Sequence, residues 1–317
     1  MDTVGTERLG LTIGSIFSFI SVGELAAPVL GGVLYKKVGD AGVFGLGGAM
    51  LMVDFTMRLL VIEKKSAASY SEDLAVDDDT QRISTEKKEY EVPPNQHSWV
   101  QKFPFSYCLK DPSLLTALLV AFVHASLLAS FDATVPIEGQ ELFGFDSLKA
   151  GLLFIALDIP YLILGPIAGW VVDRYGTKPA AVLGFTYLVP VLILLRLPHG
   201  GVRSQIILYS AILSLCGIGL AIIGSSSIVE ASQVVQKYHK ANPGFFGANG
   251  PYAQLYGVNS MVFSAGLTVG PLLSGGLRDK IGYGNMNLAV ASLALITAVL
   301  SFLFVEGTPQ SIKTRKR

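Results

Sequence analysis

Four ionisable side chains lie within long apolar stretches of this sequence. His124 and Asp158 are each near the middle of such a stretch, Glu24 is also deep within one, and Asp132 lies near an end. A histidine changes charge near neutral pH, and a carboxylate shielded from water can do the same. We predict these four residues as candidates for binding a substrate or a coupling proton. For His124, simple packing within the protein is an equal alternative, and Asp132 can be a charge at the rim of the membrane.

Two further charged groups have the spacing of one helix face. Asp54 and Arg58 are four residues apart within an apolar stretch, and residues at this spacing are neighbours on a helix. We predict that they form a structural ion pair.

A run of charged residues and glycines follows the apolar stretch 149–172. It reads GWVVDRYGTKP, with Asp173 and Arg174 where a helix would leave the membrane. A carboxylate there can cap a neighbouring helix or pair with a base, and such contacts can form in one conformation and break in another. We predict a conformational latch in which Arg174 pairs with Glu230, with the charged groups under about 4 Å apart in one state. The other members of the predicted latch are Gly169, Asp173, Gly176 and Lys178.

The composition indicates a membrane protein. The 317 residues are 51% hydrophobic and 15% charged, whereas a soluble domain is about one quarter charged. Eight apolar stretches approach the roughly 20 residues that a helix needs to cross the hydrocarbon. Such continuous runs exclude the alternating pattern of a barrel, so we predict an all-α membrane bundle of eight helices. The predicted spans are 9–34, 41–62, 113–135, 149–172, 179–197, 204–229, 255–277 and 284–305.

Basic residues are distributed unequally across the predicted membrane. Sixteen lysines and arginines fall on the side of the two termini, and seven fall on the other side. Because cytosolic loops carry the excess of basic residues, both termini are predicted to be cytosolic. The net charge of +0 gives no basic face for nucleic acid.

The segment 63–112 interrupts the apolar pattern with many Ser, Glu, Asp and Lys residues and two consecutive prolines. This composition predicts a disordered linker. The acidic run 77–79 is expected to be solvated, because no second cluster completes a metal site. The predicted domains are a two-span remnant at 1–62, this linker, a six-span half at 113–305 and a basic tail at 306–317.

An internal repeat relates the two ends of the chain. A shift of 243 residues aligns Ser21–Gly39 with Ser264–Gly282 without a gap and gives eight identities in 19 positions. Parallel repeats are a known construction of transporters. The first and seventh spans are therefore predicted to be equivalent helices of two halves.

Both copies of the repeat are rich in glycine and contain a proline. Glycines let helix backbones approach closely in lipid, and a proline bends the helix by removing one backbone hydrogen bond. We predict a tight, bent contact with a partner helix, with ordinary packing of small residues as the alternative. The residues concerned are Gly23, Pro28, Gly31, Gly32, Gly266, Gly270, Pro271 and Gly275.

These motifs resemble those of the major facilitator superfamily. GWVVDRYGTKP fits the family's signature loop GxxxDRxGxK, and GELAAPVLGG at 23–32 resembles its antiporter signature GxxxGPxxGG, with Ala27 in place of a glycine. The chain resembles fungal drug:proton antiporters and vesicular amine transporters in particular. It matches their helices five to twelve, so the resemblance implies a partial facilitator fold that lacks the first four helices.

The resemblance implies multidrug-type transport of small organic molecules by proton-coupled efflux, with two bundles rocking about a site at mid-membrane. It implies no cofactor and no metal, and no GxSxG, HExxH or Walker motif suggests an enzyme. Its expected partners are a substrate, protons, the bilayer of the plasma or vacuolar membrane, and another chain that covers the incomplete half. The alternative is a truncated, transport-inactive paralogue or an incomplete gene model, acting at most as a membrane scaffold or interaction protein.

Overall fold

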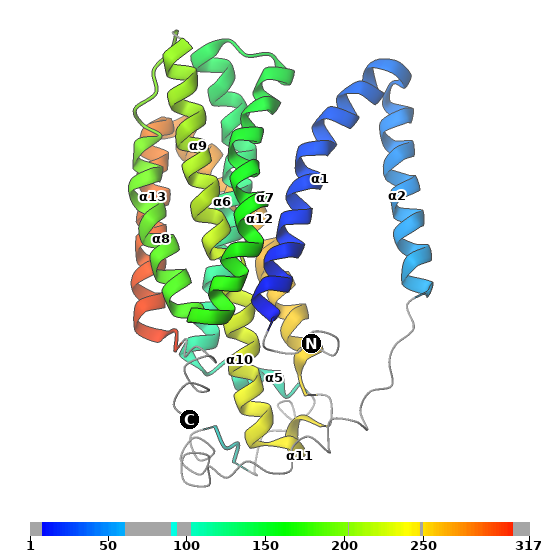
Figure 1. Ribbon diagram of the computed structural model, residues 1–317, viewed down its shortest axis with the longest axis vertical. Coiled ribbons are helices and arrows are strands. Elements are labelled where there is room, and N and C mark those ends of the chain that lie inside the picture. The colour runs from blue at the N-terminus through cyan, green and yellow to red at the C-terminus, as the bar shows by residue number, and fades with distance from the viewer. Residues whose placement is uncertain (1–7, 61–89, 94–102, 202, 248–249, 307–317) are drawn as a thin grey trace. The chain divides into compact units, whose positions relative to one another are not determined.

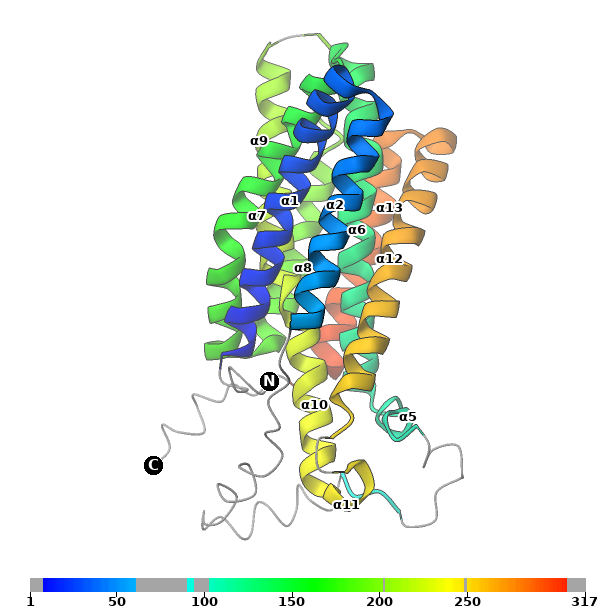
Figure 2. The ribbon, with the colours of Figure 1, turned by 90° about the vertical axis from the view of Figure 1, so that its right-hand side faces the viewer.

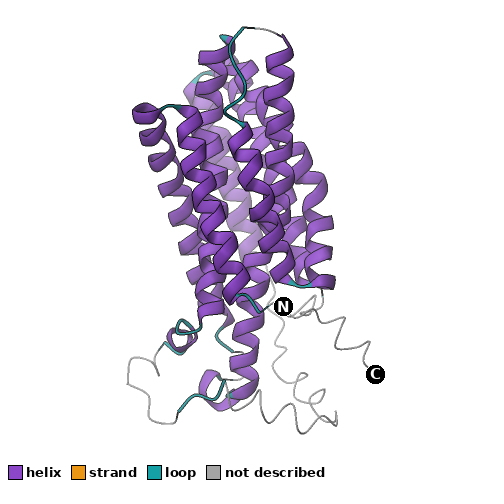
Figure 3. Ribbon diagram, turned by 90° about the vertical axis from the view of Figure 1, so that its left-hand side faces the viewer, coloured by secondary structure: helices purple, strands orange, loops and turns teal. Residues whose placement is uncertain are grey.

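The chain folds almost entirely into helices. The computed structural model describes residues 8–60, 90–93, 103–201, 203–247 and 250–306, and within these ranges there is no strand (Figure 3). Eight helical segments in them are long and apolar enough to cross a membrane. The predicted class, an all-α bundle of eight spans, is therefore confirmed.

The structure gives the bounds of each span. Most helices are longer than predicted, and the sixth span is divided at Ser225 and continues to Ala241. Two short helices, α5 (Phe105–Cys108) and α11 (Pro243–Phe246), lie outside the spans. The spanning elements are α1 (Leu9–Val38), α2 (Asp40–Leu60), α6 (Pro112–Phe143), α7 (Ser147–Tyr175), α8 (Thr177–Leu194), α9 (Arg203–Gly224) continued by α10 (Ser226–Ala241), α12 (Tyr252–Ile281) and α13 (Tyr283–Phe304).

Local sequence sets the two ends of α6, the most buried of the described helices. At its start the Asp111 carboxylate accepts a hydrogen bond from the Ser113 N–H at 2.8 Å, and Pro112 occupies the first turn, where its missing N–H has no cost. At its end Gly144 adopts a φ of 63°, a conformation that favours glycine.

The contacts divide the chain into two units. The first unit contains residues 1–21 and 79–317, and the second contains residues 22–78. The predicted first domain, 1–62, is therefore split within α1. The reason is that the first turns of α1 pack against α7, where Gly10 and Gly14 lie directly on Gly169 and Gly165.

In the first unit, six spans pack side by side (Figure 1). Helix α6 contacts α7, α9, α10, α12 and α13, and its centre belongs to one large apolar core with buried residues such as Phe185, Leu188 and Tyr209. We call the end of this unit that carries Leu9, Pro112 and Thr177 the terminal end, and the end that carries Phe143 the distal end.

The predicted repeat is visible in the helix bounds. Helices α1 and α12 both have 30 residues, and a shift of 243 residues places Leu9 on Tyr252 and Val38 on Ile281. Each helix is followed by a glycine with positive φ, 72° at Gly39 and 80° at Gly282. Helices α2 and α13 then begin at once. The two helical hairpins α1–α2 and α12–α13 are thus equivalent elements.

A small apolar cluster covers part of the terminal end. Helix α10 extends beyond the ends of α7 and α8, with α5 and α11 near it (Figure 2). Phe105, Cys108, Tyr238 and Leu255 are buried in this cluster together with Tyr90. Part of the predicted disordered linker 63–112 is therefore ordered, because its aromatic residues find apolar partners on α10. The acidic run 77–79 lies outside the described residues.

Candidate functional site

His124 lies in the interior of the first unit, where three aromatic rings surround it. Its side chain is 1% exposed. The imidazole centroid is 5.7 Å from that of Phe17 on α1, 6.0 Å from that of Phe263 on α12 and 6.3 Å from that of Tyr161 on α7. The first two contacts are edge to face and the third is stacked. Four helices thus contribute to one aromatic group around an ionisable ring.

The Nε2 atom of His124 has no hydrogen-bond partner among the described residues. It faces the end of α9, because a Cβ built on Gly224 would lie 3.7 Å from the imidazole Cε1 and 4.0 Å from Nε2. The same Cβ would be 3.3 Å from the Tyr161 hydroxyl oxygen. A buried ring nitrogen therefore points to a glycine beside the break between α9 and α10.

The other midplane candidates are placed differently. Asp158 is also buried, at 6% exposure, and precedes Tyr161 by three residues, so that both lie on one face of α7. Asp158 thus lies on the face of α7 that also carries Tyr161, the ring stacked on His124. Asp132 has an exposed side chain on α6. Glu24 belongs to the second unit and is exposed there.

Asp173 caps the N-terminus of α1. Its carboxylate accepts hydrogen bonds from the backbone N–H groups of Gly10 at 2.7 Å and Leu11 at 2.8 Å. These groups have no partner within their own helix, and the negative charge lies at the positive end of the helix dipole. Of the two contacts considered for this residue, the structure contains the helix cap. The glycine contact between Gly10 and Gly169 brings the two backbones close enough for it.

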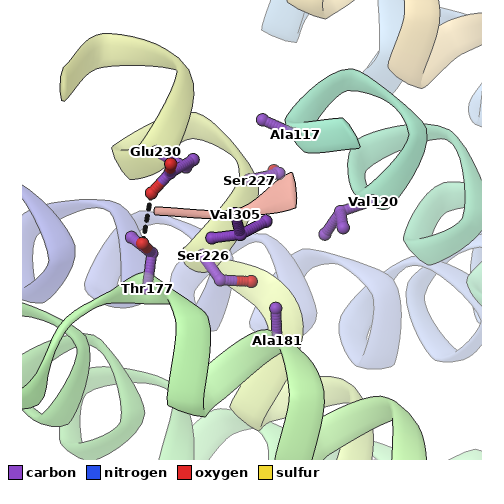
Figure 4. A pocket seen from close by; sticks show the side chains of 8 residues that line it. All are labelled: Ala117, Val120, Thr177, Ala181, Ser226, Ser227, Glu230 and Val305. Atoms are coloured by element: carbon purple, nitrogen blue, oxygen red, sulfur yellow. Dashed lines mark hydrogen bonds between the residues drawn. The ribbon is translucent and has the colours of Figure 1, made fainter. Parts of the chain in front are cut away.

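Glu230, at 3% exposure, lies among hydroxyl and backbone donors. It accepts a hydrogen bond from Ser113 at 2.7 Å, one from Thr177, and one from the Glu306 N–H at 3.3 Å. Figure 4 shows the Thr177 contact in a small pocket lined by Ala117, Val120, Thr177, Ala181, Ser226, Ser227, Glu230 and Val305. Glu230 thus joins the terminal ends of α6, α8, α10 and α13.

The expected pair between Arg174 and Glu230 is not present in this conformation, because the hydroxyl and N–H donors occupy the carboxylate. The Arg174 guanidinium lies 5.3 Å from the Trp170 ring and 5.8 Å from the Tyr175 ring. Nearby, Lys178 lies over the ring of Phe302 at 5.3 Å. The pairing remains a prediction for another state.

Gly176 forms the turn between α7 and α8. Its φ of 96° and ψ of 167° place it in a region that only glycine adopts readily. It is at once the C-cap of α7 and the N-cap of α8. The signature loop therefore needs glycine here for its backbone conformation.

The two copies of the glycine and proline motif lie in different units. In the first unit, Gly266 and Gly270 pack α12 against α6, since a Cβ on either would lie 2.4 Å from a carbonyl oxygen, that of Phe122 or Ser126. Pro271 lies within α12, and a Cβ at Gly275 would meet no atom within 4 Å.

In the second unit, Gly23 and Gly31 have no such contact within that unit. The surroundings of Pro28 and Gly32 are not among the described features of the chain. In the same unit, the predicted pair of Asp54 and Arg58 is confirmed at 2.7 Å.

One ionic cluster was missed by the sequence analysis. At the distal end, Arg278 lies 3.2 Å from the Glu138 carboxylate and 2.7 Å from that of Glu141. Glu138 and Glu141 are three residues apart, so they lie on one face of α6. This spacing of three residues could have indicated the cluster. The predicted span ends at residue 135, however, and therefore does not include either glutamate.

These features define an integral membrane protein of the transporter type, with duplicated helical hairpins, backbones in close contact and buried ionisable groups. The sequence matches the Major Facilitator Superfamily over residues 1–249. The chain belongs to this family. It is 45% identical to the MFS-type transporter ppzB of Metarhizium majus, over 98% of this chain and 75% of that protein.

More distant relatives have the same type of name. Over 93% of this chain and 66% of the relative, the identity is 35% to the uncharacterized MFS-type transporter C18.02 of Schizosaccharomyces pombe. It is 20% to the human chromaffin granule amine transporter, over 92% of this chain and 48% of that protein. Family membership supports membrane transport of small molecules.

Proposed function

We propose that this chain takes part in the proton-coupled efflux of small organic molecules by alternating access. The observation that carries the proposal is the buried imidazole of His124, whose Nε2 atom lacks a hydrogen-bond partner among the described residues and is surrounded by aromatic rings. An ionisable group in the interior of a membrane bundle is costly and usually serves function.

A single ring nitrogen can couple the binding of a proton to the binding of a substrate. Nε2 of neutral His124 can accept either a proton or a hydrogen bond from a substrate N–H group, but not both. Two ligands that exclude each other at one site are coupled thermodynamically, as antiport requires. Asp158, buried on the same face of α7 as Tyr161, is the second candidate for the proton.

The rings also favour a class of substrate. Phe17, Tyr161 and Phe263 can stabilise a cation by about 0.5–2 kcal/mol each when it lies over a ring face. An organic amine has both the positive charge and the N–H donor. The relative named as an amine transporter is consistent with this choice.

The remaining parts of the proposal concern the membrane. The excess of basic residues supports a cytosolic location for the terminal end. The plasma membrane and the vacuolar membrane both fit a protein that removes organic amines from the cytosol. Another chain covering the second unit would complete the carrier.

The test is transport by the purified chain in proteoliposomes, with a radiolabelled aromatic amine and an imposed pH gradient. We expect gradient-driven uptake that His124→Gln lowers by about tenfold or more, since one factor of ten corresponds to about 1.4 kcal/mol. His199→Gln is the matched control, because this histidine is exposed in the described loop between α8 and α9. Asp158→Asn is expected to abolish the response to the gradient.

Two results would contradict the proposal. Unchanged dependence on the pH gradient in His124→Gln and Asp158→Asn would remove the proton role from both residues. No uptake by the chain, alone or with an added partner, would favour the transport-inactive alternative.

A further inference from the structure

A short segment of the linker that belongs to no helix, residues 90–93, lies against α10. Tyr90 and Val92 face the protein, at 8% exposure for Tyr90 and partial burial for Val92, whereas Glu91 and Pro93 are exposed. This alternation with a period of two is that of a strand that rests on a surface. We call residues 90–92 the strap.

Asn242 recognises the backbone of the strap. Its Nδ2 group donates to the Tyr90 carbonyl oxygen at 2.7 Å, and its Oδ1 atom accepts from the Val92 N–H at 2.9 Å. The carbonyl of one residue and the N–H of the second residue after it point to the same side of an extended chain, so one amide can bind both. Extended peptides are commonly bound through main-chain hydrogen bonds of this kind.

The Tyr90 side chain makes the contacts that depend on the sequence of the strap and not on its backbone alone. Its ring lies edge to face on Tyr238 at 5.0 Å, and Lys237 Nζ lies 5.4 Å from the ring centroid. Its hydroxyl donates to both carboxylate oxygens of Glu306 at 3.2 Å. Lys237 forms an ion pair with the same carboxylate. The strap therefore connects α10 to Glu306, the second residue after α13.

Glu306 connects the strap to the buried carboxylate of the terminal end. Its backbone N–H donates to Glu230 Oε1 at 3.3 Å, and Glu230 also binds the hydroxyls of Ser113 and Thr177. A continuous chain of hydrogen bonds thus runs from Tyr90 through Glu306 and Glu230 to the first residues of α6 and α8.

We propose that Lys237, Tyr238, Asn242 and Glu306 form a binding site for an extended peptide, whose ligand is the chain's own strap. Docking of the strap orders Glu306 and thereby strengthens the hydrogen bonds that hold the terminal ends of α6, α8 and α13 on Glu230. Release of the strap loosens them. The linker is in this way a regulatory element, and the inference is independent of whether the chain transports.

The contacts of the strap are weak enough for it to bind and dissociate reversibly. Each hydrogen bond contributes only modestly to stability, because water competes for the same groups, and the ion pair between Lys237 and Glu306 is partly exposed and contributes little. Local opening at such a cost is far easier than unfolding of the bundle. Because strap and site belong to one chain, weak contacts are sufficient for docking.

Hydrogen exchange of the whole purified chain tests the docking. Asn242→Ala removes both backbone contacts, and we expect residues 90–92 to exchange at least about tenfold faster. Asn285→Ala is the matched control, because this exposed amide on α13 donates to the carbonyl of Ile281, the last residue of α12. Unchanged exchange at 90–92 in Asn242→Ala would overturn the assignment of the site.

Tyr90→Phe tests the connection to Glu230. It retains the ring and loses the hydroxyl, so we expect faster exchange of the Glu306 N–H while residues 90–92 remain protected. Unchanged exchange at Glu306 would show that the strap has no influence on the Glu230 contacts. Exchange at 90–92 that depends on protein concentration would instead place the strap on a second copy of the chain.

Cysteine labelling gives a second readout. Cys108 is fully buried in the cluster that holds Tyr90, and burial, aided by Asp111, raises the pKa of its thiol to about 12. It should react slowly with a maleimide at pH 7.5, and about tenfold faster in Asn242→Ala. Cys216, buried within α9, should remain unreactive in both. Labelling of both thiols would indicate unfolding, and the exchange data then decide on the strap.

Discussion

Two helix pairs in the first unit, α1 with α7 and α12 with α6, bring their backbones into close contact in different ways. We call each of these contacts a seam. Between α1 and α7, glycines stand on both sides: a Cβ on Gly169 would lie 2.1 Å from the Gly10 carbonyl oxygen, and one on Gly14 would lie 2.3 Å from that of Gly165. Between α12 and α6, the glycines at the closest contacts belong to α12 alone, and Gly270 rests on the backbone of Ser126. A seam with glycines on both sides brings two main chains together with no side chain between them.

Among the described residues, each seam has charged groups in contact with the facing helix at one of its two ends. The α1–α7 seam ends at the terminal end with the Asp173 carboxylate on the N–H groups of Gly10 and Leu11. The α12–α6 seam ends at the distal end with Arg278 between two glutamates of α6. The comparison indicates that small residues set how closely two helices approach, whereas charged groups determine at which end the contact is secured.

The largest effect is expected from Gly169→Leu. The new side chain has no space against the Gly10 carbonyl, so the first turns of α1 must leave α7. We expect destabilisation of at least about 3 kcal/mol, measured as a lower midpoint of thermal unfolding in detergent. Gly151→Leu on the same helix is the control, because a Cβ there meets no atom within 4 Å. Equal losses in both variants would contradict the importance of the seam.

A smaller effect is expected from Gly270→Leu in the other seam. Here glycine stands on one side of the contact alone, and a Cβ on Gly270 would lie 2.4 Å from the Ser126 carbonyl oxygen, compared with 2.1 Å from the Gly10 carbonyl oxygen for one on Gly169. The expected destabilisation is about 1–3 kcal/mol by the same measurement. Gly275→Leu, which points into open space in the described part of the chain, should leave the midpoint unchanged. If Gly270→Leu is the more harmful of the two seam variants, the comparison of the seams is wrong.

The smallest effect is expected from Asp173→Asn. Asparagine retains one acceptor oxygen but loses the charge, so the cap of α1 should weaken by about 1 kcal/mol. The N–H groups of Gly10 and Leu11 should then exchange roughly fivefold faster, because about 1.4 kcal/mol corresponds to tenfold. Asp146→Asn weakens the cap of α7 itself and should not change these two amides. Identical exchange in wild type and Asp173→Asn would rule out the cap.

Periodicity and hydropathy were sufficient to predict the helices of the fold from the sequence. Hydropathy placed all eight spans, since a long apolar run has few alternatives in lipid. The spacing of Asp54 and Arg58 gave their pair, and the shift of 243 residues gave the equivalence of α1 and α12. Each of these predictions depends on order along the chain alone.

Contacts between distant parts of the chain were harder to predict. Gly10 and Gly14 have no distinguishing pattern in the sequence. Their role in packing is evident only from the glycines of α7 that they face. The donors on Glu230 come from three separate helix ends, which are far apart in the sequence and could not be assigned to it. The sequence therefore suggested Arg174, a basic residue of the signature loop, as its partner. Tyr90 stands among charged residues in a polar segment, and only the apolar cluster on α10 accounts for its burial.

The position of Glu230 has one further electrostatic consequence. Its carboxylate accepts hydrogen bonds from hydroxyls in the first turns of both α6 and α8, where the N-terminal ends of the two helices carry partial positive charge. Among the described residues, its hydrogen-bond donors are two hydroxyls and the Glu306 N–H, and no arginine or lysine forms an ion pair with it. Salt or the loss of a basic side chain should affect this anion far less than a change in the direction of either helix.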